Sequence, residues 1–197
     1  TKITLTEAVV TGLPAHVKFT GYEWLEGMDG VIVSGDKQTA TLTVKSMDPE
    51  ALELKNTFES HGTFAVRKVV AGAFALRSNE MADSVFEVNY STDTGESGTL
   101  ELNAANDWTA AGQEYAAGTK ITLTERTPAQ FSAGVGWKSQ EWLESPGVEI
   151  SPDGKTAVLT VQKDAPIAEL TLLNTAFREG SFSVAKVVDG NMTLDDP

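Results

Sequence analysis

The sequence has no cysteine among its 197 residues, which excludes disulfides, thiolate metal sites and a cysteine nucleophile. Histidine and proline are also scarce, with 2 and 7 residues. The apolar runs are too short to cross a bilayer, so no membrane insertion is expected within this segment. If such a protein works outside the cell, something other than a disulfide must stabilise it.

Basic residues are outnumbered, with 15 lysines and arginines against 28 acidic residues and a net charge of −13. They form no cluster that could follow a phosphate backbone, so we expect neither a nucleic-acid partner nor an anionic membrane surface. The acidic loops, such as 48–50 and 93–96, are interpreted as solvated surface, because no spacing brings enough oxygens together for calcium. No glycine-rich phosphate loop is present, and we expect no metal and no other cofactor.

The dominant feature of the chain is an internal repeat with an offset of 118 residues (120 − 2 = 118). The repeated pairs are KITLTE at 2–7 and 120–125, EWLE at 23–26 and 141–144, and GTFAVRKVV at 62–70 with GSFSVAKVV at 180–188. We predict one complete repeat at 62–177, the C-terminal half of a preceding repeat at 1–58, and the first strand of a following repeat at 180–197. The sequence opens without a signal peptide and closes without a sorting signal, so we interpret it as a fragment of a longer protein.

The complete repeat is predicted to consist of strands alone. Apolar and polar residues alternate along it, and Asp153-Gly154 is a strong hairpin signal. The predicted strands are 63–70, 84–90, 98–102, 119–125, 135–142, 148–151, 156–162 and 168–176, with a loop or single turn at 73–82. Short strands at this spacing predict an all-β fold of tandem antiparallel β-sandwich domains, of the immunoglobulin-like or transthyretin-like kind.

Three polar residues, Lys68, Glu125 and Asn174, each continue the apolar face of a predicted strand. The rows that they continue are Phe64/Val66, Ile121/Leu123 and Leu170/Leu172. Their counterparts at the repeat offset are Lys186, Glu7 and Asn56. Any one of the three alone would be explained as a strand-end residue that turns or snorkels to water.

Taken together, the three residues indicate a shared site, because an unpaired buried charge is costly and each can satisfy the others. Burial lowers the pKa of a lysine and raises that of a glutamate, so a neutral amine could lie beside a protonated carboxyl. The Lys68 amine could then attack the carboxamide of Asn174, while Glu125 polarises it, moves protons and lets ammonia leave. The product would be an amide cross-link between the first and the last strand.

The order of a lysine on the first strand, a glutamate in a TLTE strand and an asparagine in a final NT strand resembles the collagen-adhesin B-type (Cna B-type) domains of Gram-positive pilins and surface adhesins. The segments GTFAVRKVVAG, FEVNYS, GTLEL, AAGTKITLTE and LNTAF also look like a repeat domain of unknown function from cell-wall-anchored actinobacterial proteins. The resemblance implies an autocatalytic Lys–Asn isopeptide bond, with Lys68 as nucleophile, Asn174 as electrophile and Glu125 as the proton-shuttling acid. Glu7, Asn56 and Lys186 would then be half sites of flanking repeats.

The function that this resemblance implies is a structural stalk segment of a cell-surface adhesin or pilin-like protein, extracellular and anchored to the cell wall. Its partners would be neighbouring repeats of the same protein, and its only reaction the self-catalysed cross-link, so no enzyme activity is expected. Two alternatives stay open. The sandwich could bind a host protein or glycan through loops such as 91–97 or 126–134, or it could be an accessory domain of a secreted polysaccharide-degrading enzyme.

The aromatic residues and the histidines are candidates for separate sites. Trp24, Trp142 and Trp137 are expected in the core rather than on a sugar-binding platform, whereas Trp108 is expected to be exposed. His16 and His61 have no histidine at the equivalent repeat positions, so a repeated site cannot depend on them. We therefore expect neither a Ser-His-Asp triad nor a histidine metal site.

Overall fold

The computed structural model describes residues 1–45, 52–72, 83–126, 134–163 and 167–187. Within these residues the secondary structure is strands plus one short 3-10 helix, η1 (Ala104–Asn106), so the predicted all-β fold class is confirmed. No helix in the described ranges is long and apolar enough to cross a membrane. The loop or turn predicted at 73–82 lies outside the described residues.

The complete repeat consists of two sheets that enclose one apolar core. The first sheet has the order β12-β13-β10-β6-β7. Its strands are β6 (Phe86–Thr92), β7 (Ser97–Leu102), β10 (Lys120–Glu125), β12 (Val148–Ile150) and β13 (Thr156–Thr160). As predicted, Asp153-Gly154 lies in the turn between β12 and β13, where Gly154 has a φ of 71°. Only glycine adopts such a φ without steric cost.

The second sheet contains β11, β14 and β5 in that order, and the short strands β8 and β9 also pair with β5. The bounds are β5 (Leu54–Ala71), β8 (Thr109–Ala111), β9 (Tyr115–Ala116), β11 (Val135–Trp142) and β14 (Ile167–Arg178). The sequence did not predict β8 and β9, because two or three residues are too few to show an alternating pattern. The fully buried core side chains include Phe64, Val66, Val88, Leu102, Ile121, Leu123 and Leu172.

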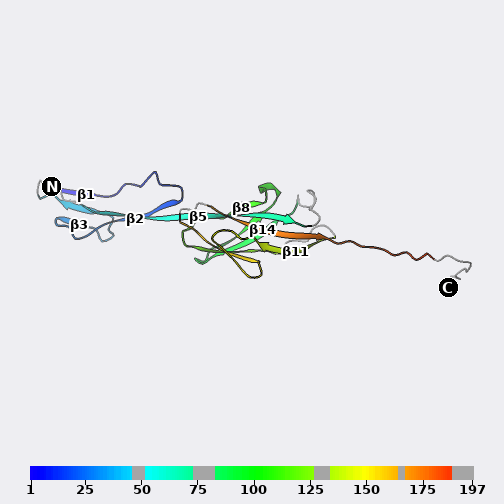
Figure 1. Ribbon diagram of the computed structural model, residues 1–197. Helices are drawn as coiled ribbons and strands as arrows, with labels where there is room; N and C mark the ends of the chain where they lie inside the picture. Colours follow the sequence, from blue (N-terminus) through cyan, green and yellow to red (C-terminus); the bar gives the residue numbers. More distant parts are fainter. Residues whose placement is uncertain (46–51, 73–82, 127–133, 164–166, 188–197) are drawn as a thin grey trace, which may run out of the picture.

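The first and last strands of the complete repeat, β5 and β14, are neighbours that run parallel, with Lys68 opposite Leu172 and Asn174 opposite Val70. The other strand pairs are antiparallel. Because the first and last strands point the same way, the chain enters this sandwich at one pole and leaves it at the other. Figure 1 shows the result: β1 lies at one end of an elongated molecule, and residues 181–187 extend away at the other.

The N-terminal segment repeats part of this architecture. A three-stranded sheet has the order β1-β4-β3, and β2 pairs with the first part of β5. The bounds are β1 (Lys2–Leu5), β2 (Val17–Trp24), β3 (Val31–Val33) and β4 (Ala40–Thr43). β5 continues through residues 59–61, so one strand links the N-terminal unit to the complete repeat. The boundary predicted between 58 and 62 falls inside this strand, and the domain limits stay a prediction.

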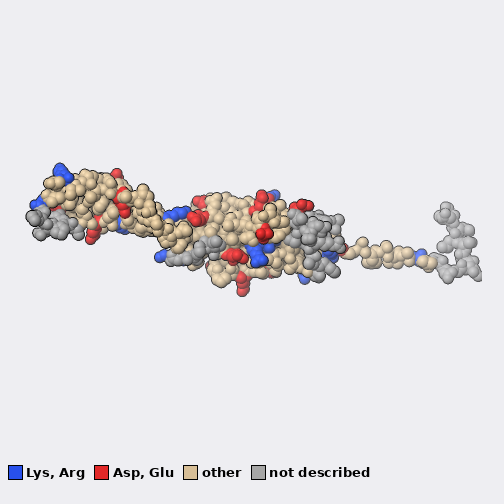
Figure 2. All heavy atoms as spheres, turned by 90° about the horizontal axis from the view of Figure 1, so that it is seen from above, with Lys and Arg blue, Asp and Glu red and all other residues tan. Residues whose placement is uncertain are grey.

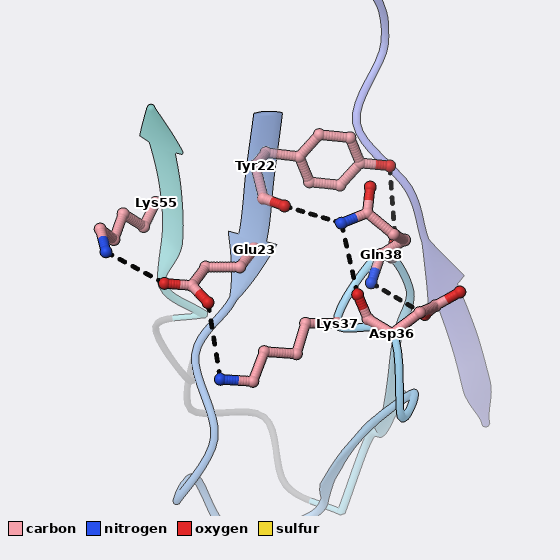
Figure 3. Close-up of polar contacts among 6 residues, drawn as sticks. All are labelled: Tyr22, Glu23, Asp36, Lys37, Gln38 and Lys55. Atoms are coloured by element: carbon pink, nitrogen blue, oxygen red, sulfur yellow. Dashed lines mark hydrogen bonds and ion pairs between the residues drawn. The ribbon is translucent and has the colours of Figure 1, made fainter. Parts of the chain in front are cut away.

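The hairpin turn at residues 34–39 differs from its counterpart in the complete repeat. Lys37 has a φ of 59°, whereas glycine occupies the equivalent position 154, at the offset of 117 (154 − 37) that holds in this region. Glu23 lies between Lys37 and Lys55, with N–O distances of 3.5 and 3.0 Å (Figure 3). These ion pairs are exposed, and such pairs contribute little to stability. Lys37 therefore occupies a left-handed position without a strong compensating contact.

Replacing Lys37 by glycine should stabilise the N-terminal unit by about 1 kcal/mol relative to Lys37→Ala, because glycine relieves the steric cost of the positive φ. Both variants lose the ion pair with Glu23, so the comparison isolates the backbone effect. Thermal denaturation of the two variants, followed by circular dichroism, measures it. Equal midpoints for both would contradict the prediction.

Candidate functional site

Lys68 lies on β5 with its side chain inside the sandwich and an exposed fraction of 4%. Strand alternation places it there, because Phe64 and Val66 on the same face are fully buried. Its Nζ donates to Oε1 of Glu125 over 2.6 Å and lies 4.7 Å from the centre of the Phe86 ring. The lysine therefore continues an apolar row into the core, where its amine contacts the carboxyl group of Glu125.

Glu125 and Asn174 reach the same point from two other strands. Glu125 ends β10 in the facing sheet, and Asn174 comes from β14 beside β5. Nδ2 of Asn174, which is fully buried, donates to Oε1 of Glu125 over 3.1 Å. Oε2 of Glu125 and Oδ1 of Asn174 are buried without a hydrogen-bond partner. The structure thus brings the three predicted site residues together and leaves two acceptor oxygens there without a donor.

Burial controls the protonation of this site. It lowers the pKa of Lys68 to about 8, although the attraction of Glu125 acts in the opposite direction. Burial also raises the pKa of Glu125, against the effects of Lys68 and of the hydrogen bond from Asn174. Both shifts favour the neutral forms, because a low-dielectric interior penalises charge. The site can therefore hold a neutral amine beside a protonated carboxyl.

Two tryptophans flank the phenylalanine that covers the lysine. The Phe86 ring packs edge-on against Trp108 and Trp137, each with a centroid distance of 5.9 Å. The backbone N–H of Lys68 donates to the carbonyl of Trp108 over 2.8 Å. The prediction that Trp108 is exposed is therefore wrong, since it is half-buried and packs against the core. These contacts shield the Lys68 amine from water.

Trp108 also has an unusual backbone. It has a φ of 60° and follows Asp107 with a φ of 51°. A positive φ is rare for a bulky residue, and such conformations persist only where surrounding contacts hold them. Here the contacts are the ring packing on Phe86 and the hydrogen bond to Lys68. Sequence reasoning missed both aromatic residues, because Phe86 reads as ordinary core and Trp108 has no counterpart in either partial repeat.

The remaining predicted residues take the positions expected of core and surface. Trp24 and Trp142 are buried and Trp137 packs against the core, as predicted. His61 is half-buried, and its Nε2 lies 3.0 Å from Oε2 of Glu59. Across the part of the chain that the structure describes, no three His, Cys, Asp or Glu residues are grouped to hold a metal ion.

The half sites are only partly assembled. Glu7 and Asn56 lie together, with Nδ2 of Asn56 donating to Oε1 of Glu7 over 2.8 Å, and both residues are half-buried. Lys186 lies in the exposed segment 181–187, at the other end of the molecule from β1 (Figure 1). The structure therefore reproduces the Glu–Asn contact in the N-terminal unit without bringing the third predicted residue to it.

Comparison with known families gives a match over residues 64–176 to the family described as "Domain of unknown function (DUF5979)". The chain belongs to this family. The match covers all three residues of the buried site and agrees with the motif resemblance to a repeat domain of unknown function. No curated protein matches the chain.

Similar solved structures include adhesins and pilins, as the resemblance implied. A bacterial adhesin from Mobiluncus mulieris containing intramolecular disulfide, isopeptide and ester bond cross-links is 17% identical with a TM-score of 0.46, over 73% of this chain and 45% of the adhesin chain. The pilus adhesin SpaC from Lactobacillus rhamnosus GG is 16% identical with a TM-score of 0.37, over 84% of this chain and 20% of SpaC. The major pilin T3.2 from Streptococcus pyogenes is 14% identical with a TM-score of 0.35, over 88% of this chain and 66% of the pilin. This chain thus spans less than half the length of either adhesin.

Proposed function

We propose that this chain is a structural stalk segment of a bacterial cell-surface adhesin or pilin-like protein, locked by an autocatalytic isopeptide bond between Lys68 and Asn174. The observation that carries this proposal is the buried contact of both residues with Glu125. The segment would be extracellular and anchored to the cell wall, with neighbouring repeats as its partners. The cross-link would be its only reaction, with no external substrate.

The reaction follows from the groups that meet at the site. Neutral Nζ of Lys68 attacks Cγ of Asn174, the new C–N bond forms, and the bond from Cγ to Nδ2 breaks. Once the carboxamide has rotated, protonated Glu125 can donate to Oδ1, which otherwise lacks a donor in this buried position. Glu125 then takes a proton from Nζ and passes one to the departing nitrogen, so that one ammonia leaves. The aromatic cover keeps water from competing for the carbonyl.

Intact-protein mass spectrometry tests the proposal directly. The wild-type chain should be lighter than its calculated mass by one ammonia, and a protease digest should yield a branched peptide that joins Lys68 to Asn174. Lys68→Ala should have its full calculated mass. The matched control is Lys186→Ala, which removes the repeat-equivalent lysine and should keep the loss of ammonia. A full calculated mass for the wild-type chain would remove the isopeptide bond from the proposal.

The rate of cross-linking should fall as the pH rises above about 8. The reactive pair shares a single proton between Lys68 and Glu125, so it titrates as a unit. Because burial lowers the pKa of Lys68 to about 8, the pair loses this last proton above that pH. Glu125 is then a carboxylate that has no proton to give to the leaving nitrogen. Chain recovered unfolded from inclusion bodies in urea, before it has cross-linked, and then refolded at a series of pH values should show this fall in the rate of mass loss. A rate that keeps rising with pH would contradict the prediction.

A further inference from the structure

Gln140 is a polar side chain on the core-facing side of β11, and the proposed reaction leaves it unused. It lies directly opposite Asn174 in the antiparallel pair of β11 and β14. Residues directly opposite each other in such a pair share one face of the sheet. Trp142, two positions further along β11, is buried on this face. Gln140 is therefore a half-buried carboxamide on the face that carries Asn174.

An irregularity in β11 turns Gln140 toward the core. The register between β11 and β14 shifts between Trp137 and Ser139. Under strict alternation Trp137 and Gln140 would lie on opposite faces of the strand. Trp137 nevertheless packs against the core, and Gln140 shares a face with buried Trp142. The shift therefore aims a hydrogen-bonding group at the edge of the site, which is a known use of such irregularities.

The carboxamide of Gln140 reaches the facing sheet, where its Nε2 donates to the backbone carbonyl of Glu125 over 3.4 Å. The backbone N–H of Arg126 donates to the carbonyl of Glu87 on β6. Because the C=O and N–H of one peptide group point in opposite directions, the Glu125 carbonyl points to the other edge of β10. On that edge the pairing with β13 ends at Thr124. Gln140 therefore supplies a donor at the position where β13 stops supplying one.

We propose that Gln140 is a positioning residue for the cross-link, because its hydrogen bond ties the end of β10 to the sheet that carries Lys68 and Asn174. Glu125 is the last residue of β10, so this tie holds its carboxyl against both reacting groups. A displacement of about 1 Å is enough to slow a reaction between positioned groups strongly. This inference rests on the proposed function, since it concerns how the acid of the same reaction is held.

The position of the Glu125 carboxyl also affects the charge of Lys68. Figure 2 shows charged side chains over the visible surface of the molecule, whereas these two are buried and 2.6 Å apart. Burial lowers the pKa of Lys68 to about 8, and the attraction of Glu125 opposes this lowering. A carboxyl that is held less closely attracts the amine less, so the pKa of Lys68 falls further. The pH above which cross-linking slows therefore reports how closely Glu125 is held.

Replacing Gln140 by methionine tests the inference, because methionine has a similar length and no N–H to donate. Chain recovered unfolded in urea and then refolded should lose ammonia about fivefold more slowly than the wild-type chain, the factor expected for one ordinary hydrogen bond. The pH above which the rate falls should also move below the wild-type value of about 8. Gln140→Leu, which removes the same donor with a branched side chain, should show both changes.

Gln162→Met is the matched control. Nε2 of Gln162 also donates to a backbone carbonyl, that of Thr160, over 2.9 Å. Thr160 lies opposite Lys120, at the other end of β10 from Glu125. The same chemical change at this distant position should leave both the rate and its pH dependence at the wild-type values.

The pH dependence separates a positioning role from a purely structural one, because a residue that only stabilises the fold would not move it. Gln140→Met and Gln140→Leu chains that react at the wild-type rate, or more slowly with an unchanged pH dependence, would overturn the inference and leave the proposed function in place. If circular dichroism shows that neither variant refolds, Gln140 serves the fold and the inference is equally overturned. A full calculated mass for the refolded wild-type chain would remove both.

Discussion

Replacing Lys68 by alanine should allow the complete repeat to unfold under tension, whereas the complete repeat of the wild-type chain should stay folded. Because β5 and β14 run parallel, tension enters through β5 and leaves through β14. A bond between Lys68 and Asn174 carries the load directly from one strand to the other and bypasses a loop of 106 residues (174 − 68). Release of that loop adds roughly 350 Å of contour at about 3.3 Å per residue.

Single-molecule force spectroscopy, with handles at the two termini, measures this difference. Lys68→Ala and Asn174→Ala should show the long unfolding step, and the repeat-equivalent controls Lys186→Ala and Asn56→Ala should not. Without force, Lys68→Ala and Asn174→Ala should also lose about 4.7 kcal/mol of stability, which is the loop-entropy figure for closing about 100 residues. A long unfolding step in the wild-type chain would mean that no covalent bond joins the two strands.

The continuity of β5 extends the mechanical argument beyond one repeat. Asn56 and Lys68 are 12 residues apart (68 − 56) on one strand that is already extended. Where both of their sites are cross-linked, the load passes from one bond to the next through this short piece of strand. An extended strand has little length left to gain, so a row of such repeats would stretch very little.

The site was predictable from the sequence because two independent signals agreed on it. Alternation placed Lys68, Glu125 and Asn174 on apolar faces, and repetition at a fixed offset indicated that these positions were not accidents. The structure places all three in the core, with exposed fractions of 5% or less. Neither signal reports which strands are neighbours, so the parallel pairing of β5 with β14 came from the structure alone.

The surroundings of the site were not predictable for a physical reason. Phe86 and Trp108 meet Lys68 across the core and through a turn with positive φ, and neither contact leaves a periodic pattern. The predicted boundary between units also missed the continuity of β5. Residues 59–61 are polar and look like a linker, yet His61 and Gly62 pair with β9, which keeps the strand intact.

Replacing Glu125 by glutamine should stop the cross-link while leaving both reacting groups in place. The carboxamide of glutamine cannot take a proton from Nζ of Lys68 and pass it to the leaving nitrogen, so the variant should have its full calculated mass. It should also be less stable than loss of the bond alone explains. Lys68 remains buried without a carboxylate, and removing one partner of a buried pair costs about 3–5 kcal/mol.

Urea denaturation of Glu125→Gln beside Asn174→Ala separates these two effects. Both variants lack the bond, but only Glu125→Gln loses the buried ion pair between Lys68 and Glu125, so it should unfold at the lower urea concentration. Glu7→Gln is the matched control, because it makes the same change at the equivalent position of the N-terminal unit and should keep the loss of one ammonia. A Glu125→Gln chain that is still lighter by one ammonia would show that Lys68 and Asn174 react without the carboxyl, and the acid role assigned to Glu125 would be wrong.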